Sequence, residues 1–271
     1  MKKLTVGLLL LALLSLWLLW GNTALQVNTW IIESEEIPSS FDGFRIAQVS
    51  DLHNAGFWEE VVAALAEAEP DIIVLTGDLI DSGKTDVEAA LSFAEQAVAI
   101  APCYAVTGNH EAWSGDAWDV LRTGLLREGV VLLEDEAVFL DQDGETVALL
   151  GLSDPAFGSD QAALLRERTA GEGYTILLSH RPELISYYEE TPFDLVLCGH
   201  AHGGQVIVPS LINGLYAPHQ GLFPKYAGGE YIMANGGKMI VSRGLSRLVR
   251  PRVFNRPELV LVTLLPLGEE R

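Results

Sequence analysis

Cysteine is scarce in this sequence of 271 residues, which contains only Cys103 and Cys198. Each belongs to an apolar stretch that we predict to be a β-strand. Cys103 lies six residues before Asn109, whereas Cys198 lies two residues before His200. If both strands end at the same edge of a sheet, the two sulfur atoms are about 10 Å or more apart along the strand direction. We therefore expect two buried thiols and no disulfide.

Basic residues are also scarce. The chain has 17 Lys and Arg residues against 37 Asp and Glu residues, a net charge of −20, and the charge without Lys2 and Lys3 is −22. An acidic surface repels nucleic-acid phosphates, so we expect no nucleic-acid partner. The sequence also lacks internal repeats and low-complexity tracts, and 49% of its residues are hydrophobic, which excludes a disordered chain. Its length suits one sizeable α/β domain with a well-buried core.

The N-terminal segment differs from the rest of the chain. Lys2 and Lys3 precede an almost uninterrupted apolar run of 17 residues from Leu4 to Trp20. This run is at the lower limit for crossing a bilayer and too long for a typical signal-peptide core. Asn22 stands where a cleavage site would need a small residue. We therefore favour an uncleaved signal anchor over residues 1–24 to a cleaved signal or a buried core helix.

This anchor predicts a single-pass protein of the cell membrane. The positive-inside tendency keeps the two lysines in the cytoplasm and places residues 25–271 outside it. Cleavage of the segment would instead make the protein secreted. We expect a monomer.

Residues 25–271 are predicted to form a single α/β domain without a dividing linker. Up to residue 127, apolar runs alternate with amphipathic helices, which implies parallel strand pairing. Beyond residue 130, hairpin signals such as Asp143-Gly144 imply antiparallel pairing. The predicted strands are 23–34, 44–50, 71–77, 103–108, three short strands within 130–154, 174–179, 193–199, 204–209, a hairpin over 230–242 and 258–265, and the predicted helices are 58–69, 87–100, 116–127, 160–170 and 182–190.

Five of these strands end in polar residues of the same kinds, and five of the six histidines lie just beyond them. The carboxyl ends of strands in open α/β sheets are where sites are built. The clusters are Asp51 and His53 in "SDLH", Asp78 and Asp81 in "TGDLID", Asn109, His110 and Glu111 in "TGNHE", His180 in "LLSHRPE", and His200 and His202 in "LCGHAHGG".

These residue types indicate a metal site. Asp, His and Asn together, without Cys, suit divalent ions such as Mn²⁺, Fe²⁺ or Zn²⁺. In Asp-x-His and His-x-His, an extended backbone would point both side chains to the same side, so that each pair could reach one ion or two neighbouring ions. Gly77, Gly108 and Gly199 each immediately precede a candidate ligand and permit sharp strand exits and close backbone approach.

Each motif alone has a simpler explanation. A single Asp after a strand is usually a turn or cap residue, and we interpret Asp81 in that way. A single His at a strand end is more often a surface group than a ligand. Asn54 is expected to cap the helix that begins near Trp58 rather than to contact substrate. Five such motifs at successive strand ends of one domain make a coincidence improbable.

Taken in order, these motifs resemble the signature of the calcineurin-like metallophosphoesterases, and most closely that of their bacterial membrane-anchored or exported branch. The similarity extends through "FDGFRIAQVSDLHN", "GLFPKY", "VSRGL" and "FNRPELV", so that it covers about residues 26–265. The resemblance implies a four-layer αββα sandwich of two mixed β-sheets flanked by helices. It also implies two divalent metal ions and a phosphate-ester substrate.

The resemblance further assigns a role to each candidate residue. The metal ligands would be Asp51, His53 and His202 for the first ion, Asn109, His180 and His200 for the second, and Asp78 as the bridge between the two. His110 would be a catalytic histidine that binds no metal. His219, the remaining histidine, is by default a loop residue, with contact to substrate as the alternative.

Two ions roughly 3.5–4 Å apart can share one hydroxide and lower its pKa toward neutrality. The predicted function is therefore hydrolysis of a phosphodiester or pyrophosphate by attack of that hydroxide. The alternative from another class is a non-catalytic extracytoplasmic metal- or phosphate-binding module, which is disfavoured because no ligand position is lost. A metal-dependent amide or ester hydrolase without phosphorus is poorly supported.

Five arginines lie within 14 residues near the C-terminus, at Arg243, Arg247, Arg250, Arg252 and Arg256. One interpretation is a set of dispersed surface arginines and structural ion pairs. The other is a basic edge that faces anionic headgroups. Together with the anchor, such an edge would favour a phospholipid or glycolipid phosphate as substrate.

Overall fold

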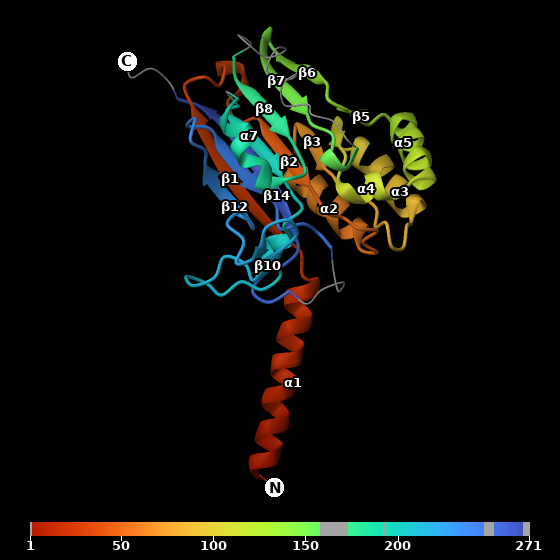
Figure 1. Ribbon diagram of the computed structural model, residues 1–271, viewed down its shortest axis with the longest axis vertical. Helices are drawn as coiled ribbons and strands as arrows, with labels where there is room; N and C mark the ends of the chain where they lie inside the picture. Colours follow the sequence, from red (N-terminus) through yellow and green to blue (C-terminus); the bar gives the residue numbers. More distant parts are fainter. Residues whose placement is uncertain (1, 158–172, 192, 247–251, 268–271) are drawn as a thin grey trace.

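The computed structural model describes residues 2–157, 173–191, 193–246 and 252–267. Two six-stranded mixed sheets pack face to face, and helices lie on their outer faces (Figure 1). The first sheet has the order β1 (Gln26–Ser34), β14 (Glu258–Pro266), β2 (Arg45–Val49), β3 (Ile72–Thr76), β4 (Cys103–Val106), β5 (Val131–Leu132), and the second the order β12 (Gly229–Ile232), β13 (Lys238–Val241), β9 (Leu195–Cys198), β8 (Thr175–Leu178), β7 (Glu145–Gly151), β6 (Ala137–Gln142). A separate short pair is formed by β10 (Tyr216–Ala217) and β11 (Gly221–Leu222).

Strands that alternate with helices pair in parallel, and hairpin strands pair antiparallel. The parallel runs are β2-β3-β4-β5 in the first sheet and β7-β8-β9-β13 in the second. The hairpin between β6 and β7 turns at Asp143 and Gly144, which both have positive φ, as a tight two-residue loop requires. The C-terminal β14 returns to pair antiparallel with β2 and parallel with β1.

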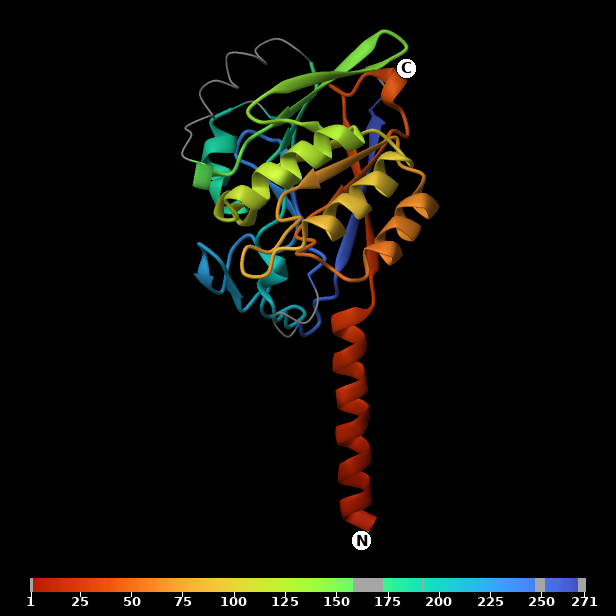
Figure 2. The same cartoon turned by 90° about the vertical axis from the view of Figure 1, so that its right-hand side faces the viewer.

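Three amphipathic helices cover the first sheet (Figure 2): α2 (Trp58–Ala68), α3 (Val87–Val98) and α5 (Asp116–Glu128). In α2, Val61 and Leu65 lie four residues apart on one buried face. On the second sheet, the 3₁₀ turn η3 (Pro182–Leu184) leads into the short α7 (Ile185–Glu189). The other helical elements are η1 (Ser39–Phe41), α4 (Asn109–Trp113), η2 (Pro155–Phe157) and η4 (His202–Gly204). The helix predicted over residues 160–170 lies outside the described residues.

Aliphatic side chains from both sheets fill the space between them, including Ile46 and Val74 of the first sheet and Leu149 and Leu197 of the second. The central strands β3, β8 and β9 are buried along their whole length. A strand covered on both faces has no solvent side, which explains the continuous apolar runs in the sequence. The predicted four-layer αββα sandwich of two mixed sheets is confirmed.

Two predicted elements of the second half differ from the structure. In the described part of the chain, residues 204–209 form no strand, and Val206 makes only an isolated bridge to Val253. Gln205 has a φ of 63°, which interrupts the extended backbone that a strand needs. Residues 211–229, where no strand is predicted, contain the short β10–β11 pair.

The N-terminal helix α1 (Lys2–Thr23) projects from one end of the domain (Figure 1). Its segment Thr5–Thr23 is long and apolar enough to cross a membrane. The last turn is tied to the C-terminal part of the chain: the side-chain amide of Asn22 donates to the Arg252 carbonyl oxygen at 2.8 Å and accepts from the Arg252 N–H at 2.6 Å. The division into residues 1–24 and 25–271 as anchor and domain stays a prediction.

Both cysteines are free and buried, as predicted. They belong to different sheets, since Cys103 begins β4 and Cys198 ends β9. Burial raises the pKa of Cys103 to about 12 and also raises that of Cys198 well above its ordinary value.

We predict that neither thiol reacts with a chromogenic disulfide reagent in the native protein. The reactive species is the thiolate, which is scarce for a buried thiol with a raised pKa. Both thiols should react once denaturant unfolds the chain. Rapid modification of either thiol under native conditions would contradict this structure.

Candidate metal centre

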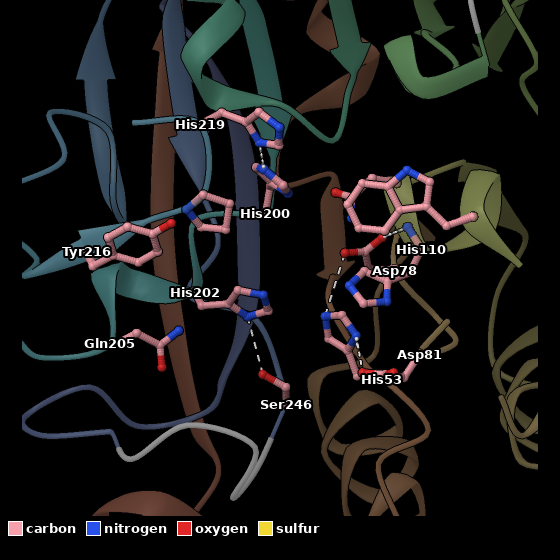
Figure 3. Close-up of a pocket in the computed structure, with 13 residues that line it drawn as sticks. His53, Asp78, Asp81, His110, His200, His202, Gln205, Tyr216, His219 and Ser246 are labelled. Atoms are coloured by element: carbon pink, nitrogen blue, oxygen red, sulfur yellow. Dashed lines mark hydrogen bonds and ion pairs between the residues drawn. The ribbon is translucent and has the colours of Figure 1, made fainter. Parts of the chain in front are cut away.

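The eight residues predicted to build the site lie together at the carboxyl ends of five strands. Asp51 and His53 follow β2, Asp78 follows β3, Asn109 and His110 begin α4 after β4, His180 follows β8, and His200 and His202 follow β9. Both sheets therefore contribute. Six of the eight line a cavity of about 250 Å³ (Figure 3), and the side chains of Asp51 and His180 lie fully buried beneath it.

The backbone of the Asp-x-His and His-x-His motifs is not extended, which corrects the prediction. The φ angles are 54° at Asp51, 46° at His53, 66° at His200 and 49° at His202. Each strand ends before its motif begins, and the Asp51 N–H bonds to the carbonyl oxygen of Gly77 at 3.0 Å. Left-handed turns, rather than strand alternation, aim these side chains at the cavity. Leu52, between the two motif residues, lies in the hydrophobic core beside the first sheet.

Asp51, His53 and His202 form one group able to hold a metal ion. The Nε2 atoms of His53 and His202 lie 3.8 Å and 3.6 Å from Oδ1 of Asp51. The ring of His202 is oriented by the hydroxyl of Ser246, 3.2 Å from Nδ1. The ring of His53 has the carboxylate of Asp81 3.6 Å from its Nδ1. Both Nε2 atoms are thus directed toward the same carboxylate.

Asp78, His180 and His200 form a second such group. Nδ1 of His180 lies 2.7 Å from the Thr76 carbonyl oxygen. Because that oxygen can only accept, Nδ1 carries a proton and Nε2 faces the centre. This Nε2 lies 3.1 Å from Nδ1 of His200 and 3.2 Å from Oδ2 of Asp78. The same Oδ2 is 3.6 Å from Nε2 of His53, so Asp78 lies between the two groups.

Several buried polar atoms of this centre have no hydrogen-bond partner within the described part of the chain. They are Nδ1 and Nε2 of His53, Oδ2 of Asp78 and Oδ1 of Asn109. Buried polar atoms without partners are rare and require an explanation such as a bound ion. Nitrogen and oxygen donors without sulfur suit Mn²⁺, Fe²⁺ or Zn²⁺. The donor set therefore fits divalent metal ions.

Without ions, the carboxylates and histidines of the centre neutralise one another. Burial favours a higher pKa for Asp51 and Asp78, but the surrounding histidines lower both pKa values below their usual range. Burial favours a lower pKa for His53 and His180, but the neighbouring carboxylates raise both to about 10. The ion-free centre therefore holds two protons at neutral pH that metal ions would have to displace.

Gly108 and Gly199 allow the strand ends to approach as closely as was predicted. A Cβ added at Gly108 would clash with the carboxylate of Asp78, and one added at Gly199 would clash with the hydroxyl of Ser50. Only a residue without a side chain fits at these two positions.

Glu111 is a residue to which the sequence reasoning gave no role. Its buried carboxylate accepts hydrogen bonds of 2.8 Å from the N–H groups of Asp78, Leu79 and Gly108. It thereby joins the end of β3 to the start of α4. Burial raises its pKa to about 7. The available sequence signal was its place at the third position of a helix, where Glu commonly accepts from the backbone at the helix start.

His110 lies beside His53, with the two ring centroids 4.5 Å apart. Its Nδ1 accepts a hydrogen bond from the Ser82 N–H at 2.9 Å, so the neutral ring carries its proton on Nε2. Burial lowers the pKa of His110, which favours this neutral form. Its backbone N–H donates to Oδ1 of Asp78 at 2.8 Å. The Nε2–H group is left as a donor at the cavity.

His219 is a loop residue, as expected, but it also lines the cavity. Its Nδ1 lies 2.7 Å from Nη1 of Arg181 and 2.9 Å from Nε2 of His200. Because a guanidinium only donates, Nδ1 of His219 accepts from Arg181. Nδ1 of His200 faces Nε2 of His180 at 3.1 Å. Contact between His219 and substrate stays a prediction.

Arg181 was not anticipated from the sequence. It is buried and forms a two-point ion pair with Asp154, with N–O distances of 2.5 Å and 2.9 Å. Two parallel hydrogen bonds fix the plane of the guanidinium and thus the position of His219. Asp154 lies just beyond β7, so a carboxylate at a further strand end was the signal that could have identified this pair.

The predictions for Asp81 and Asn54 are partly correct. Asp81 has the predicted turn role, because its side chain accepts from the Gly83 N–H at 2.8 Å, and it also faces His53. Asn54 has a structural role but does not cap α2, which begins without a side-chain cap. Its Oδ1 accepts from the N–H groups of Asp81 and Asp86 and so holds the loop beside the centre.

The described arginines of the C-terminal cluster are engaged within the protein. Arg252 is buried, and its guanidinium donates to three backbone carbonyl oxygens. Arg256 donates to two carbonyl oxygens just after α1, and Arg243 lies 3.8 Å from a buried carboxylate. The interpretation as structural contacts is correct for these three, and a basic edge made by them is wrong. Arg247 and Arg250 lie outside the described residues.

Comparison with known proteins gives matches over most of the chain. Residues 44–204 match the family described as calcineurin-like phosphoesterase. Phosphodiesterase YaeI of Escherichia coli is 29% identical over 229 residues, which cover 82% of this chain and 82% of that protein. UDP-2,3-diacylglucosamine pyrophosphatase LpxG of Chlamydia muridarum is 26% identical over 276 residues, which cover 82% of this chain and 84% of that protein.

A solved structure supports the fold. The crystal structure of a dimetal phosphatase from Danio rerio aligns with a TM-score of 0.50 at 11% sequence identity, over 75% of this chain and 88% of that chain. At this identity the likeness concerns the architecture alone.

We predict that loading the metal-free protein with Mn²⁺ releases about two protons at pH 7, because metal-ligating histidines must give up the protons that His53 and His180 carry. Both pKa values are raised, so the protonated forms persist up to about pH 10 and affinity should rise with pH below it. Calorimetric titration in buffers of different ionisation enthalpy counts the protons. Release of none at pH 7 would contradict the assigned charges.

We predict that Gly108→Ala weakens metal binding at least about tenfold and destabilises the fold by about 1–3 kcal/mol, because the new methyl group displaces Asp78. Gly56→Ala is the matched control, since a Cβ at Gly56 meets nothing within 4 Å. Equal metal affinity and equal thermal stability for the two variants would show that Gly108 is not needed at this contact.

Proposed function

We propose, from the premise that the chain belongs to the calcineurin-like phosphoesterase family and is a hydrolase, that it cleaves a phosphodiester or a pyrophosphate with two divalent metal ions. The observation that carries the proposal is the convergence of three donor atoms: Nε2 of His180 lies 3.1 Å from Nδ1 of His200 and 3.2 Å from Oδ2 of Asp78. Oδ1 of Asn109, at the same centre, has no hydrogen-bond partner among the described residues.

The two groups of side chains would hold one ion each. Asp51, His53 and His202 are assigned to the first ion and Asn109, His180 and His200 to the second, with Asp78 as the bridge because its Oδ2 faces histidines of both groups. When bound, such ions would activate water and neutralise charge on the phosphoryl group. Thr76, Ser246 and Asp81 hold the rings from behind, which keeps the donor atoms aimed before an ion arrives.

His110 is assigned to the substrate rather than to a metal ion. The neutral tautomer fixed by Ser82 leaves Nε2–H free to donate to a phosphoryl oxygen. A preorganised donor of this kind is worth most where charge grows in the transition state. Since burial lowers its pKa, His110 acts at neutral pH chiefly as a hydrogen-bond donor, and general-acid action would require its protonated form at lower pH.

The net charge of the protein and the charge of the metal ions together decide whether an anionic substrate can approach. The chain without its N-terminal lysines carries −22, which would repel a phosphate ester. Four positive charges from two ions, set against the carboxylates of Asp51 and Asp78, invert the local field. Asn109 as a neutral ligand adds no negative charge at that point.

The names of the relatives suggest the class of ester. YaeI is called a phosphodiesterase and LpxG a pyrophosphatase of UDP-2,3-diacylglucosamine. We propose a diester or pyrophosphate substrate, including one carried by a lipid. We further propose that α1 anchors a monomeric protein in the cell membrane, with residues 25–271 outside the cytoplasm.

We predict that the full-length metal-stripped protein in detergent gains activity on a chromogenic phosphodiester when titrated with Mn²⁺, Fe²⁺ or Zn²⁺. His110→Ala should keep two bound metal ions and lose roughly 10²–10³-fold in kcat, as expected for loss of one positioned donor. Asp78→Ala should instead lose metal, because it removes the shared carboxylate. Metal content by elemental analysis separates the two effects.

Two results would contradict these assignments. Absence of phosphate-ester hydrolysis with every ion tested would refute it. Loss of metal from His110→Ala would show that His110 is a ligand.

A further inference from the structure

The end of α1 is fixed against the segment that precedes β14. The ring of Trp17 packs edge-on against Phe254, with centroids 4.8 Å apart. The guanidinium of Arg256 lies 4.6 Å from the centre of the Trp20 ring. Together with the hydrogen bonds of the last helical turn, these contacts set the height of the domain relative to the helix.

Because the domain is held close to the end of α1, it contacts any bilayer that α1 crosses. The apolar run from Leu4 to Trp20 has 17 residues, which at 1.5 Å per residue measure about 26 Å. The hydrocarbon layer is about 30 Å thick, so the whole run is needed inside it. Trp17 belongs to this run, and Phe254, which touches it, is 55% exposed. Phe254 must therefore reach the membrane surface.

Residues 206–228 lie at the same end of the domain as α1 (Figures 1 and 2). Outside α1, the four most exposed large apolar side chains that the structure describes are Leu211, Ile232, Leu222 and Phe223, at 79%, 78%, 68% and 63%. Three of the four belong to this segment. Removing such side chains from water is favourable, and a group of them at one end marks an interaction surface.

The same part of the sequence almost lacks acidic residues. From Leu195 to Pro257 there is one acidic residue, Glu230, of the 37 in the chain, against seven of the 17 basic residues. The carboxylate of Glu230 is paired with Lys238 at 3.0 Å. In a chain of net charge −20, this part presents no net negative charge to an anionic lipid surface.

We infer that residues 206–228 and Phe254 form a docking surface that rests on the lipid bilayer beside α1. Tyr216 and His219 of this segment also line the cavity of the candidate metal centre, so the docking surface and the cavity share a wall. The centre then opens at the level of the headgroups. The docking surface follows from the helix and the surface residues; the further statement that the substrate is a phosphate ester of a membrane lipid rests on the proposed function.

Position-specific fluorescence in the full-length protein tests the docking surface. An environment-sensitive probe is attached to Leu222→Cys and, as matched control, to Ile232→Cys in the β12–β13 hairpin, after reconstitution into phosphatidylcholine–phosphatidylglycerol vesicles. The native thiols are buried and stay unlabelled. We expect lipid-borne quenchers to act at position 222 and aqueous iodide to act at position 232. Equal quenching by iodide at both positions would overturn the inference, whether or not the protein hydrolyses anything.

Measurements of hydrolysis rates test whether the substrate is a phosphate ester of a membrane lipid. The triple variant Leu211→Ser, Leu222→Ser, Phe223→Ser should lose at least about tenfold in activity on a vesicle-borne phospholipid diester and keep its activity on a soluble chromogenic diester. Ile232→Ser, an equally exposed apolar site, should change neither. An equal loss on both substrates, or no loss on vesicles, would show that the surface does not deliver a lipid substrate. Absence of any turnover in the unaltered protein would refute the proposed function instead.

Discussion

The candidate centre depends on hydrogen bonds that cross from one sheet to the other at their carboxyl ends. The side-chain amide of Gln48 in β2 donates to the last carbonyl oxygen of β9 at 2.8 Å. The N–H of His200 donates to the carboxylate of Asp51 at 3.0 Å, and Nδ1 of His180 bonds to the carbonyl oxygen of Thr76. These bonds are buried, where a lost partner is costly. Because each of the two groups able to hold a metal ion draws on both sheets, a shift of one sheet against the other would separate its residues.

Because the two sheets approach closely, the carboxylates of the centre are buried and their negative charges must be neutralised. Asp51 and Asp78 are fully buried carboxylates, Oδ2 of Asp78 has no hydrogen-bond partner among the described residues, and protons held on His53 and His180 compensate the two negative charges when no ion is bound. Divalent ions in the same place would supply that compensation and release the protons. Burial of these carboxylates destabilises the ion-free protein, and the same burial favours the binding of divalent ions.

The sequence identified the parts of the site that lie in short motifs and missed the parts made by distant contacts. Strand ends with Asp, His and Asn could be predicted because parallel strands deliver their carboxyl ends to one place. The left-handed backbone at Asp51 and His200 could not, because it depends on how each chain leaves its sheet. Arg181 and His219 are in contact although 38 positions separate them in the sequence, and no local sequence pattern predicts such a contact. The strand expected over residues 204–209 failed for a related reason, since apolar composition alone does not reveal a positive φ at Gln205.

Arg252 has a structural role that the arginine cluster in the sequence does not reveal. In the sequence it belongs to a cluster that could face lipid, but its guanidinium is buried and burial lowers its pKa to about 10, so that it remains a cation at neutral pH. Its backbone pairs with Asn22 of α1, and its guanidinium bonds to the backbone carbonyl and hydroxyl of Ser246, which in turn contacts His202. Arg252 therefore contacts the last turn of α1 through its backbone and, through its side chain, the hydroxyl that lies beside a candidate ligand.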